Sequence, residues 1–336
     1  MQQFKLGKPE ASVTSLDFDD SGEFLLAACD DDSLKLYNAK SGTEVKTLFS
    51  QKYGAHLARF THHSTSIIYA STKLDDSIRY LSTHDNAFLR YFKGHTAPVT
   101  SLAVCPSSDT FLSCSLDNSV RLWSLSSPYP QARLNLSTPH LATYDPSASV
   151  IAIASSSTHS VLLYDLRNYD KAPFATFDLR RYMSPSDLLH PDWTKLDFSN
   201  DGKSLLLASN TPTGHLLLDA FDGSLRAHCP RSIGGTAPLN LRAAPGMPGQ
   251  LGQGDVTFSA DGRYLVGGSG GERDMVVWDT HGQIEIETKQ LKAMCGLPCK
   301  GRASVVEWNP RYNMCASADK EVVFWVPDEH VGMKPP

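Results

Sequence analysis

The 336-residue sequence has few cysteines and no long apolar run. No apolar stretch approaches the ~20 residues that a membrane-spanning helix needs, and Met1, Gln2 and Gln3 do not begin an apolar leader. The seven cysteines are an odd number and mostly fall within strand-like runs, which favours reduced, buried thiols over a disulfide framework. We therefore expect a soluble intracellular protein that has no association with membranes.

An excess of charge of one sign is also absent. The chain has 31 Lys and Arg residues against 36 Asp and Glu residues, for a formal net charge of -5. This balance gives no global attraction to nucleic acid, so we expect no direct nucleic-acid binding. Hydrophobic residues make up 41% of the chain, which is ample for a core. The length alone suggests two domains, but all-β rings often run longer as one domain.

A short phrase that ends a strand-like run occurs seven times in the sequence. Its copies, aligned on their aromatic position, stand at 37, 81, 123, 164, 219, 278 and 325, which is 41 to 59 residues apart. Repeats at such a period indicate a repeat architecture. Several copies follow a second run with alternating apolar residues and a turn, as at residues 13–18 and 99–104. Each unit is therefore predicted to form several short strands joined by tight turns.

The third repeat has the most complete set of polar residues around this phrase: Gly94 and His95, then Ser113 and Asp117, then Trp123. In this combination the chain resembles the WD-repeat family. The resemblance implies that His95, Ser113, Asp117 and Trp123 form a buried hydrogen-bond network, in which the Asp accepts from unpaired N–H groups of a tight turn. The equivalent turn positions of the other repeats hold Asp31, Asp75, Thr158, Thr213, Glu272 and Asp319.

Seven four-stranded units predict an all-β fold, a seven-bladed β-propeller that forms one domain over residues 1–336. The last repeat ends close to the C-terminus without a clear fourth strand, so we expect residues 4–7 to complete the seventh blade and close the ring. Two stretches depart from the repeat. Residues 167–192 are rich in aromatics and are predicted to pack on the ring, while residues 231–254 are rich in Gly and Pro and predict a surface loop.

Enzymatic function has little support in the sequence. His95, Ser113 and Asp117 have the side chains of a catalytic triad, but the repeat accounts for each of them structurally. Cys295 and Cys299 supply only two of the four ligands that a structural zinc site needs. We therefore expect no catalysis, no metal and no cofactor, and a protein that acts through the loops on its ring.

Two stretches, residues 49–60 and 73–92, contain residues that a generic blade does not require. Together with the third repeat they make the chain similar to one WD-repeat subfamily. Its members are the small subunits shared by COMPASS-type histone H3 lysine methyltransferases and, in fungi, by the cleavage and polyadenylation factor. The residues that carry this resemblance are Tyr53-Gly54, Asp75-Asp76-Ser77-Ile78-Arg79-Tyr80-Leu81-Ser82, Arg90-Tyr91-Phe92 and Pro173-Phe174-Ala175-Thr176-Phe177.

The resemblance implies a non-catalytic scaffold in the nucleus. Its implied partners are the N-terminal region of the methyltransferase catalytic subunit, a phosphatase-regulating subunit of the cleavage and polyadenylation factor, and the phosphorylated C-terminal repeats of RNA polymerase II. The implied processes are histone methylation, mRNA 3′-end processing and transcription termination.

Cations beside an aromatic side chain suit an acidic or phosphorylated extended peptide. We therefore place a partner-binding site at Lys52, Tyr53, Arg59 and Lys73, where ordinary solvated side chains are the alternative interpretation. A competing hypothesis is a substrate receptor of a cullin-type ubiquitin ligase. Residues 162–167 resemble the Trp-Asp-x-Arg box of such receptors, with Tyr164 in place of Trp.

Removal of residues 1–9 tests the predicted closure of the ring. If these residues complete the seventh blade, the truncated chain should melt at a markedly lower temperature in thermal unfolding followed by circular dichroism. An unchanged melting temperature would contradict this closure.

Overall fold

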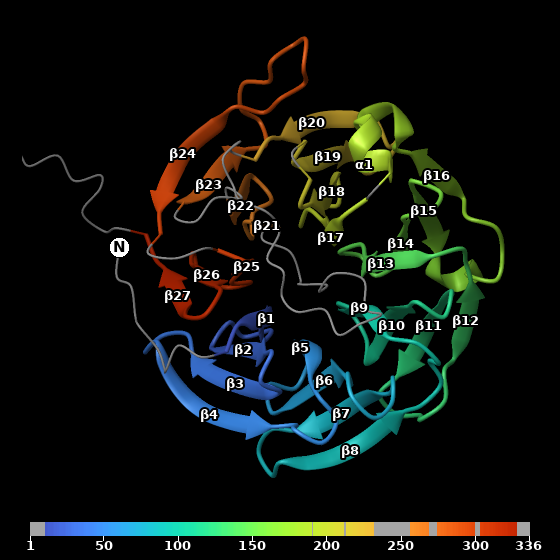
Figure 1. Ribbon diagram of the computed structural model, residues 1–336, viewed down its shortest axis with the longest axis vertical. Coiled ribbons are helices and arrows are strands. Elements are labelled where there is room, and N and C mark those ends of the chain that lie inside the picture. Colours follow the sequence, from blue (N-terminus) through green and yellow to red (C-terminus); the bar gives the residue numbers. More distant parts are fainter. Residues whose placement is uncertain are drawn as a thin grey trace, which may run out of the picture.

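The strands of the computed structural model form seven sheets that follow one another around a ring (Figure 1). The structure describes residues 11–189, 191–211, 213–231, 256–268, 274–299 and 303–327. Six sheets have four antiparallel strands each, and the last has three within the described residues. The predicted seven-bladed β-propeller is confirmed. The strand predicted at residues 4–7 lies outside the described residues, and so does most of the loop predicted at 231–254.

The first three blades are formed as follows. Blade one consists of β1 (Val13–Phe18), β2 (Phe24–Cys29), β3 (Ser33–Asn38) and β4 (Thr43–Phe49). Blade two consists of β5 (His56–Phe60), β6 (Ser66–Ala70), β7 (Ile78–Ser82) and β8 (Ala87–Phe92). Blade three consists of β9 (Val99–Val104), β10 (Thr110–Ser115), β11 (Ser119–Ser124) and β12 (Ala132–Asn135).

The remaining four blades follow the same order from the inside of the ring to its outside. Blade four consists of β13 (Pro139–Tyr144), β14 (Val150–Ser155), β15 (Ser160–Asp165) and β16 (Ala175–Asp178). Blade five consists of β17 (Trp193–Phe198), β18 (Ser204–Ser209), β19 (His215–Asp219) and β20 (Leu225–Cys229). Blade six consists of β21 (Val256–Phe258), β22 (Tyr264–Gly268), β23 (Asp274–Asp279) and β24 (Ala293–Pro298). Blade seven consists of β25 (Val305–Trp308), β26 (Cys315–Ala318) and β27 (Val322–Trp325).

The core is divided among the interfaces between neighbouring blades. Each adjacent pair of blades shares one cluster of buried apolar side chains, because a blade has apolar residues on both faces of its inner strands. Blades seven and one share such a cluster too: Leu16 and Leu25 of blade one pack with Val305 and Phe324 of blade seven. Side-chain packing between blades seven and one therefore closes the ring.

The recurring phrase forms the third strand of every blade, with one correction to its alignment. In blade four Val150 pairs with Asp165 and Ile151 with the buried aromatic Tyr164. The equivalent pairs in blade five are Ser204 with Asp219 and Leu205 with Leu218. The residue equivalent to the buried aromatic is thus Leu218, and the alignment on Asp219 is wrong by one position. The cause is that Leu replaces the aromatic in this repeat, so the phrase has no ring to mark the position before the Asp.

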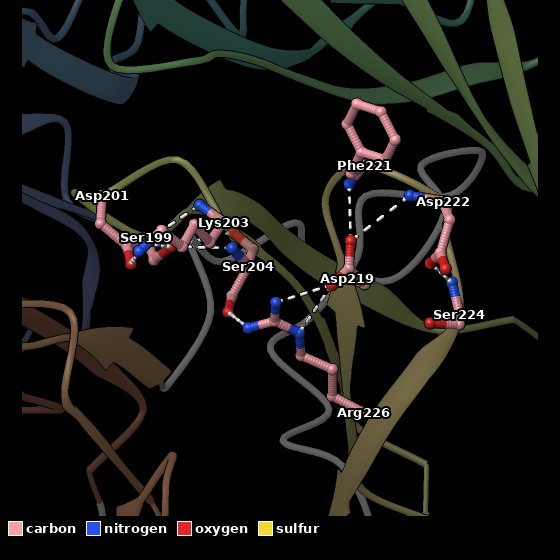
Figure 2. Close-up of polar contacts among 9 residues, drawn as sticks. All are labelled: Ser199, Asp201, Lys203, Ser204, Asp219, Phe221, Asp222, Ser224 and Arg226. Carbon is pink, nitrogen blue, oxygen red and sulfur yellow. Dashed lines mark hydrogen bonds and ion pairs between the residues drawn. The ribbon is translucent and has the colours of Figure 1, made fainter.

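Asp219 instead holds the turn after its strand (Figure 2). Its carboxylate accepts hydrogen bonds from the backbone N–H groups of Phe221 at 2.8 Å and Asp222 at 3.3 Å. The Arg226 guanidinium, from the other side of the hairpin, lies 2.6 Å from the same carboxylate. Asn38, Asp165 and Asp279 accept backbone hydrogen bonds at the same place in their blades. The polar residue after the buried aromatic position therefore caps the turn.

The segment 167–192 is only partly an insertion, which corrects the sequence-based interpretation. Its strand β16 is the regular outer strand of blade four, so the additional residues begin at Leu179. They include η2 (Arg180–Tyr182) and α1 (Pro185–Leu189). Leu179 is fully buried, and Tyr182 and Met183 pack against the cluster shared by blades four and five. The extra residues thus pack on the ring through apolar contacts.

Blade three contains the four-residue hydrogen-bond network. His95 Nδ1 lies 2.9 Å from Asp117 Oδ2, and His95 Nε2 lies 2.6 Å from Ser113 Oγ. The Trp123 indole N–H donates to the same Ser113 hydroxyl at 2.8 Å. Burial lowers the pKa of His95 and so favours the neutral ring. Burial would raise the pKa of Asp117, but hydrogen bonds from Ser119 and His95 outweigh it and bring this pKa to about 2.

Blades five and seven have partial versions of this network within the described residues. In blade seven the Trp325 indole donates to Ser317 Oγ at 2.8 Å, as Trp123 does in blade three. In blade five Thr213 stands at the turn position, and its hydroxyl donates to the Asp187 carboxylate of α1. The segment that follows blade four thus supplies the carboxylate that this turn lacks. Glu272 lies outside the described residues.

Substitution of Ser113 by Ala tests the contribution of the network to stability. The change leaves the buried Trp123 indole without its acceptor, so the free energy of unfolding should fall by about 1–3 kcal/mol in urea titrations. Ser107→Ala, at an exposed position of the same blade, is the matched control and should change stability little. Equal effects of the two substitutions would show that the network contributes nothing beyond the loss of a hydroxyl.

Candidate functional site

The candidate site is a cluster of aromatic rings around one arginine, at the junction of blades one and two. Its members are Tyr53, Arg79, Phe88 and Tyr91, which we call the aromatic site. The Arg79 guanidinium carbon lies 3.4 Å from the centre of the Tyr53 ring, 5.1 Å from that of Tyr91 and 5.7 Å from that of Phe88. The Phe88 ring also contacts Tyr53 edge-on at 5.7 Å and Tyr91 at 5.3 Å between ring centres.

Arg79 is a structural cation, because only 2% of it is exposed. Its Nη2 lies 3.0 Å from Oδ1 and 3.2 Å from Oδ2 of Asp75, and its Nε donates to the Ser71 hydroxyl at 2.8 Å. Partial burial would raise the pKa of Asp75, but the hydrogen bonds from Ser77 and the Arg79 charge hold it below its usual value. Blade two thus pairs its turn aspartate closely with an arginine. In blade three the turn aspartate Asp117 instead lies 2.9 Å from the His95 ring, and the Arg121 guanidinium is farther away, at 3.6 Å.

Tyr53 is held in place by the turn between β4 and β5. Its carbonyl oxygen accepts hydrogen bonds from the N–H groups of Thr72 and Lys73, both at 3.0 Å. Gly54 follows it with φ of +74°, and a Cβ there would lie 1.8 Å from the Thr72 hydroxyl oxygen. The Tyr53-Gly54 pair thus requires glycine for its backbone conformation and for this close approach.

A β-bulge brings Phe88 and Tyr91 to one face of the sheet. Tyr80 pairs with Arg90 and Leu81 with Phe88, so Leu89 is an extra residue in β8. Without the bulge, residues three apart would point to opposite faces. With it, both rings lie on the face that also carries Arg79. Phe88 and Tyr91 remain 37% and 38% exposed, so the site presents two ring surfaces to solvent.

The four residues predicted as a binding site do not lie together. Lys52 extends over the Tyr53 ring, with its ammonium 5.2 Å from the ring centre. Lys73 forms an ion pair with Asp32 of blade one and donates to the Gln51 carbonyl oxygen at 3.2 Å. Lys52, Tyr53 and Lys73 thus belong to neighbouring turns at the edge of blades one and two. Arg59 does not join them.

Arg59 lies on the inner strand β5, where it lines the central channel. Its Nη1 is 3.0 Å from Asp17 Oδ1, and its Nε donates to the Leu102 carbonyl oxygen at 3.4 Å. The cause is the alternation of β5, which turns Arg59 toward the channel. Its charge is thus paired with a carboxylate inside the ring rather than presented at the rim.

The channel encloses a cavity of about 300 Å³ with further paired charges. Lys195 Nζ lies 2.8 Å from Glu307 Oε2 and 3.8 Å from Asp197 Oδ2. Because Lys195 belongs to blade five and Glu307 to blade seven, this ion pair spans the channel past blade six. Burial raises the pKa of Asp17 to about 6, against the opposing effect of the Arg59 charge.

Metal-binding and membrane-spanning features are absent from the part of the chain that the structure describes. It contains no group of three or more His, Cys, Asp or Glu side chains that could hold a metal ion. Cys295 is exposed on the outer strand β24, while Cys299 is half-buried and packs beside the cluster of blades six and seven. No described helix is long and apolar enough to cross a membrane.

Residues 162–167, which resemble the Trp-Asp-x-Arg box, form the end of β15 and the start of η1 (Leu166–Asn168). Asp165 caps this short helix and accepts a hydrogen bond from the Arg167 N–H at 2.9 Å. The same capping occurs in other blades, so the blade ending accounts for Asp165.

Comparison with known proteins places the repeat in a family. The model of the WD domain, G-beta repeat (WD40), matches residues 2–38 and 86–124. WD repeat-containing protein 82 of Drosophila melanogaster is 38% identical over 325 residues, which cover 96% of this chain and 92% of the relative. The chain belongs to the WD-repeat family.

Two further relatives of this WD-repeat protein are named for a complex. COMPASS component SWD2 of Saccharomyces cerevisiae is 37% identical over 320 residues, or 94% of this chain and 91% of the relative. Set1 complex component swd2 of Schizosaccharomyces pombe is 47% identical over 221 residues, or 66% of this chain and 60% of the relative. The resemblance to subunits of COMPASS-type complexes, predicted from residues 53–54, 75–82, 90–92 and 173–177, is thereby confirmed.

Replacement of Asp17 by Asn tests the electrostatics of the channel of this WD-repeat protein. Because the pKa of Asp17 is raised, the folded state binds its proton more tightly than the unfolded chain. That contribution to stability is lost as pH rises through the folded-state pKa. The unfolding free energy of the native chain relative to Asp17→Asn should therefore fall between about pH 4 and about pH 6, and then level off. A difference that grows over this range in urea titrations would contradict the raised pKa.

Proposed function

We propose that the protein is a non-catalytic adaptor subunit of a COMPASS-type histone H3 lysine methyltransferase complex, and that it acts in the nucleus. The names of the SWD2 relatives, at 37% and 47% identity, support this assignment. The observation that carries it is the aromatic site, which lies on the stretches that distinguish this chain from a generic propeller. Its exposed rings form a contact surface that the blade fold itself does not need.

The absence of catalysis is supported by the positions of the triad-like side chains. Ser113 is fully buried and already accepts a hydrogen bond from Trp123, so its oxygen cannot reach a substrate. His95 is only 8% exposed. In the channel, the charges of Arg59 and Lys195 are each paired with carboxylates from other strands. These groups stabilise the ring.

The partner at the aromatic site is proposed to be an extended segment from the N-terminal region of the methyltransferase catalytic subunit. Phe88 and Tyr91 offer apolar ring faces, and Arg79 is committed to Asp75 beneath them. Lys73 is paired with Asp32. The site thus suits apolar or proline-containing residues, which aromatic grooves bind through ring contacts. Lys52 adds a positive charge beside it.

A second assembly follows from the same family resemblance. We propose that the protein also serves mRNA cleavage, polyadenylation and transcription termination through a phosphatase-regulating subunit. In both assemblies it would link its partners to the phosphorylated C-terminal repeats of RNA polymerase II. The alternative role as a ubiquitin-ligase substrate receptor gains no support from residues 162–167, because Asp165 serves as an ordinary turn cap.

Substitution of both Phe88 and Tyr91 by Ala tests the adaptor role. Loss of two partly exposed rings should weaken binding of the catalytic subunit's N-terminal region by about tenfold or more, as aromatic anchors at interfaces do. Isothermal titration with the purified segment measures this affinity, and circular dichroism checks that the variant is folded.

The matched control is Phe221→Ala with Tyr129→Ala, which removes one Phe and one Tyr that are 93% and 75% exposed on other blades. The control should bind like the native chain. If the Phe88 and Tyr91 variant also binds normally, the aromatic site is not the contact.

A further inference from the structure

A second groove lies on blades five and six. It has a volume of about 750 Å³. One wall is the segment after blade four, from Arg181 to Ser184, and the other is the loop before β24, from Ile286 to Gln290. The outer strand β20 contributes Leu225 and His228 to its lining. Figure 1 shows that the loop before β24 projects outward beside β20.

Both walls are anchored to the propeller. The His228 N–H donates to the Lys289 carbonyl oxygen at 2.8 Å, and the Leu291 N–H donates to the His228 carbonyl oxygen at 2.7 Å. Leu291 itself is fully buried. On the opposite side, the Thr213 hydroxyl donates to Asp187, which is buried. The groove is therefore preformed. Its walls do not have to become ordered when a ligand binds, so no binding free energy is lost to that ordering.

The charge of the groove is opposite to that of the whole chain. Its described lining contains Arg181, Arg231 and Lys289 against one carboxylate, Glu287, while the chain carries a net charge of -5. Burial and the nearby Lys289 charge lower the pKa of His228, so this imidazole is neutral at physiological pH. Arg231 is buried and donates to the Ser209 carbonyl oxygen and to Asn210 Oδ1, so the exposed cations are Arg181 and Lys289. Together these charges create a local positive potential that favours an anionic ligand.

The exposed edge of the groove adds an apolar contact. Ile286 is 92% exposed in the loop that forms one wall, and the Arg181 guanidinium lies over the Tyr182 ring at 5.4 Å. We propose that this surface, called the basic groove, binds an extended segment of a partner protein that is rich in Asp and Glu and contains an apolar residue. The negative net charge of the chain disfavours a polynucleotide, which requires a broadly positive surface.

The basic groove and the aromatic site lie on opposite sides of the ring, on β20 and β8 respectively (Figure 1). Two partner segments can therefore occupy the propeller at once without contact. The basic groove takes a different ligand from the aromatic site, so its occupancy does not depend on the proposed adaptor function.

The test uses a fluorescein-labelled peptide of alternating Glu and Ser residues around one Leu, and the full chain. Charge reversal by Arg181→Glu with Lys289→Glu should weaken binding by about tenfold or more in fluorescence anisotropy. The matched control, Lys203→Glu with Lys320→Glu, makes the same change in net charge on exposed residues outside the groove, and should weaken binding by about twofold at most.

The two charge-reversal variants distinguish binding in the groove from a general response to net charge. Equal losses in both variants, or no loss in either, would overturn the proposal, because the peptide would then sense only net charge or bind elsewhere. A single-stranded RNA serves as a competitor of the peptide. If the RNA displaces the peptide and binds the Arg181 and Lys289 variant more weakly than the native chain, the groove is a nucleic-acid site instead. The Phe88 and Tyr91 variant should bind the peptide with native affinity. A loss of affinity in that variant would contradict the proposal that the basic groove is separate from the aromatic site.

Discussion

The packing of each blade against its two neighbours is the constraint on which this structure depends. A four-stranded blade has apolar side chains on both faces of its inner strands, and only the adjacent blades can cover them. The cluster of Leu16 and Leu25 with Val305 and Phe324 satisfies this requirement at the junction of the first and last blades. Because the inner strands and the buried turns are occupied by this packing, the side chains available for recognition are those of the outer strands and the surface turns.

The same constraint separates the two kinds of charge in the molecule. Charges on inner strands face the channel and are paired across blades, as Arg59 is with Asp17 and Lys195 with Glu307. Such pairs are costly to break in a confined space, and they hold the ring rather than bind a partner. Outside the ring, recognition relies on ring surfaces at Phe88 and Tyr91 and on a local concentration of cations at the basic groove. An adaptor can thus offer two chemically different surfaces on one rigid scaffold.

The fold could be predicted from the sequence because every blade repeats one phrase, and the network of His95, Ser113, Asp117 and Trp123 follows the repeat as well. The site could be predicted only in part. Tyr53 and Arg79 both stand out because the repeat does not require them, but their stacking could not be predicted, since it depends on rings from the turn before β5 and from β8. The bulge at Leu89, which brings Phe88 and Tyr91 to one face, leaves no signal in the alternation of β8. The position of Arg59 in the channel, apart from Lys52, Tyr53 and Lys73, could not be predicted, because a cation on an inner strand has the same sequence appearance as one at the rim.

The central claim is that the propeller binds its methyltransferase partner through the aromatic site. The most direct measurement is a crystal structure of the chain with the N-terminal region of the catalytic subunit. The account predicts an extended segment seated on Tyr53, Phe88 and Tyr91, with Arg79 still bonded to Asp75. A segment bound in the central channel or on another blade, with these three rings still exposed to solvent, would contradict it.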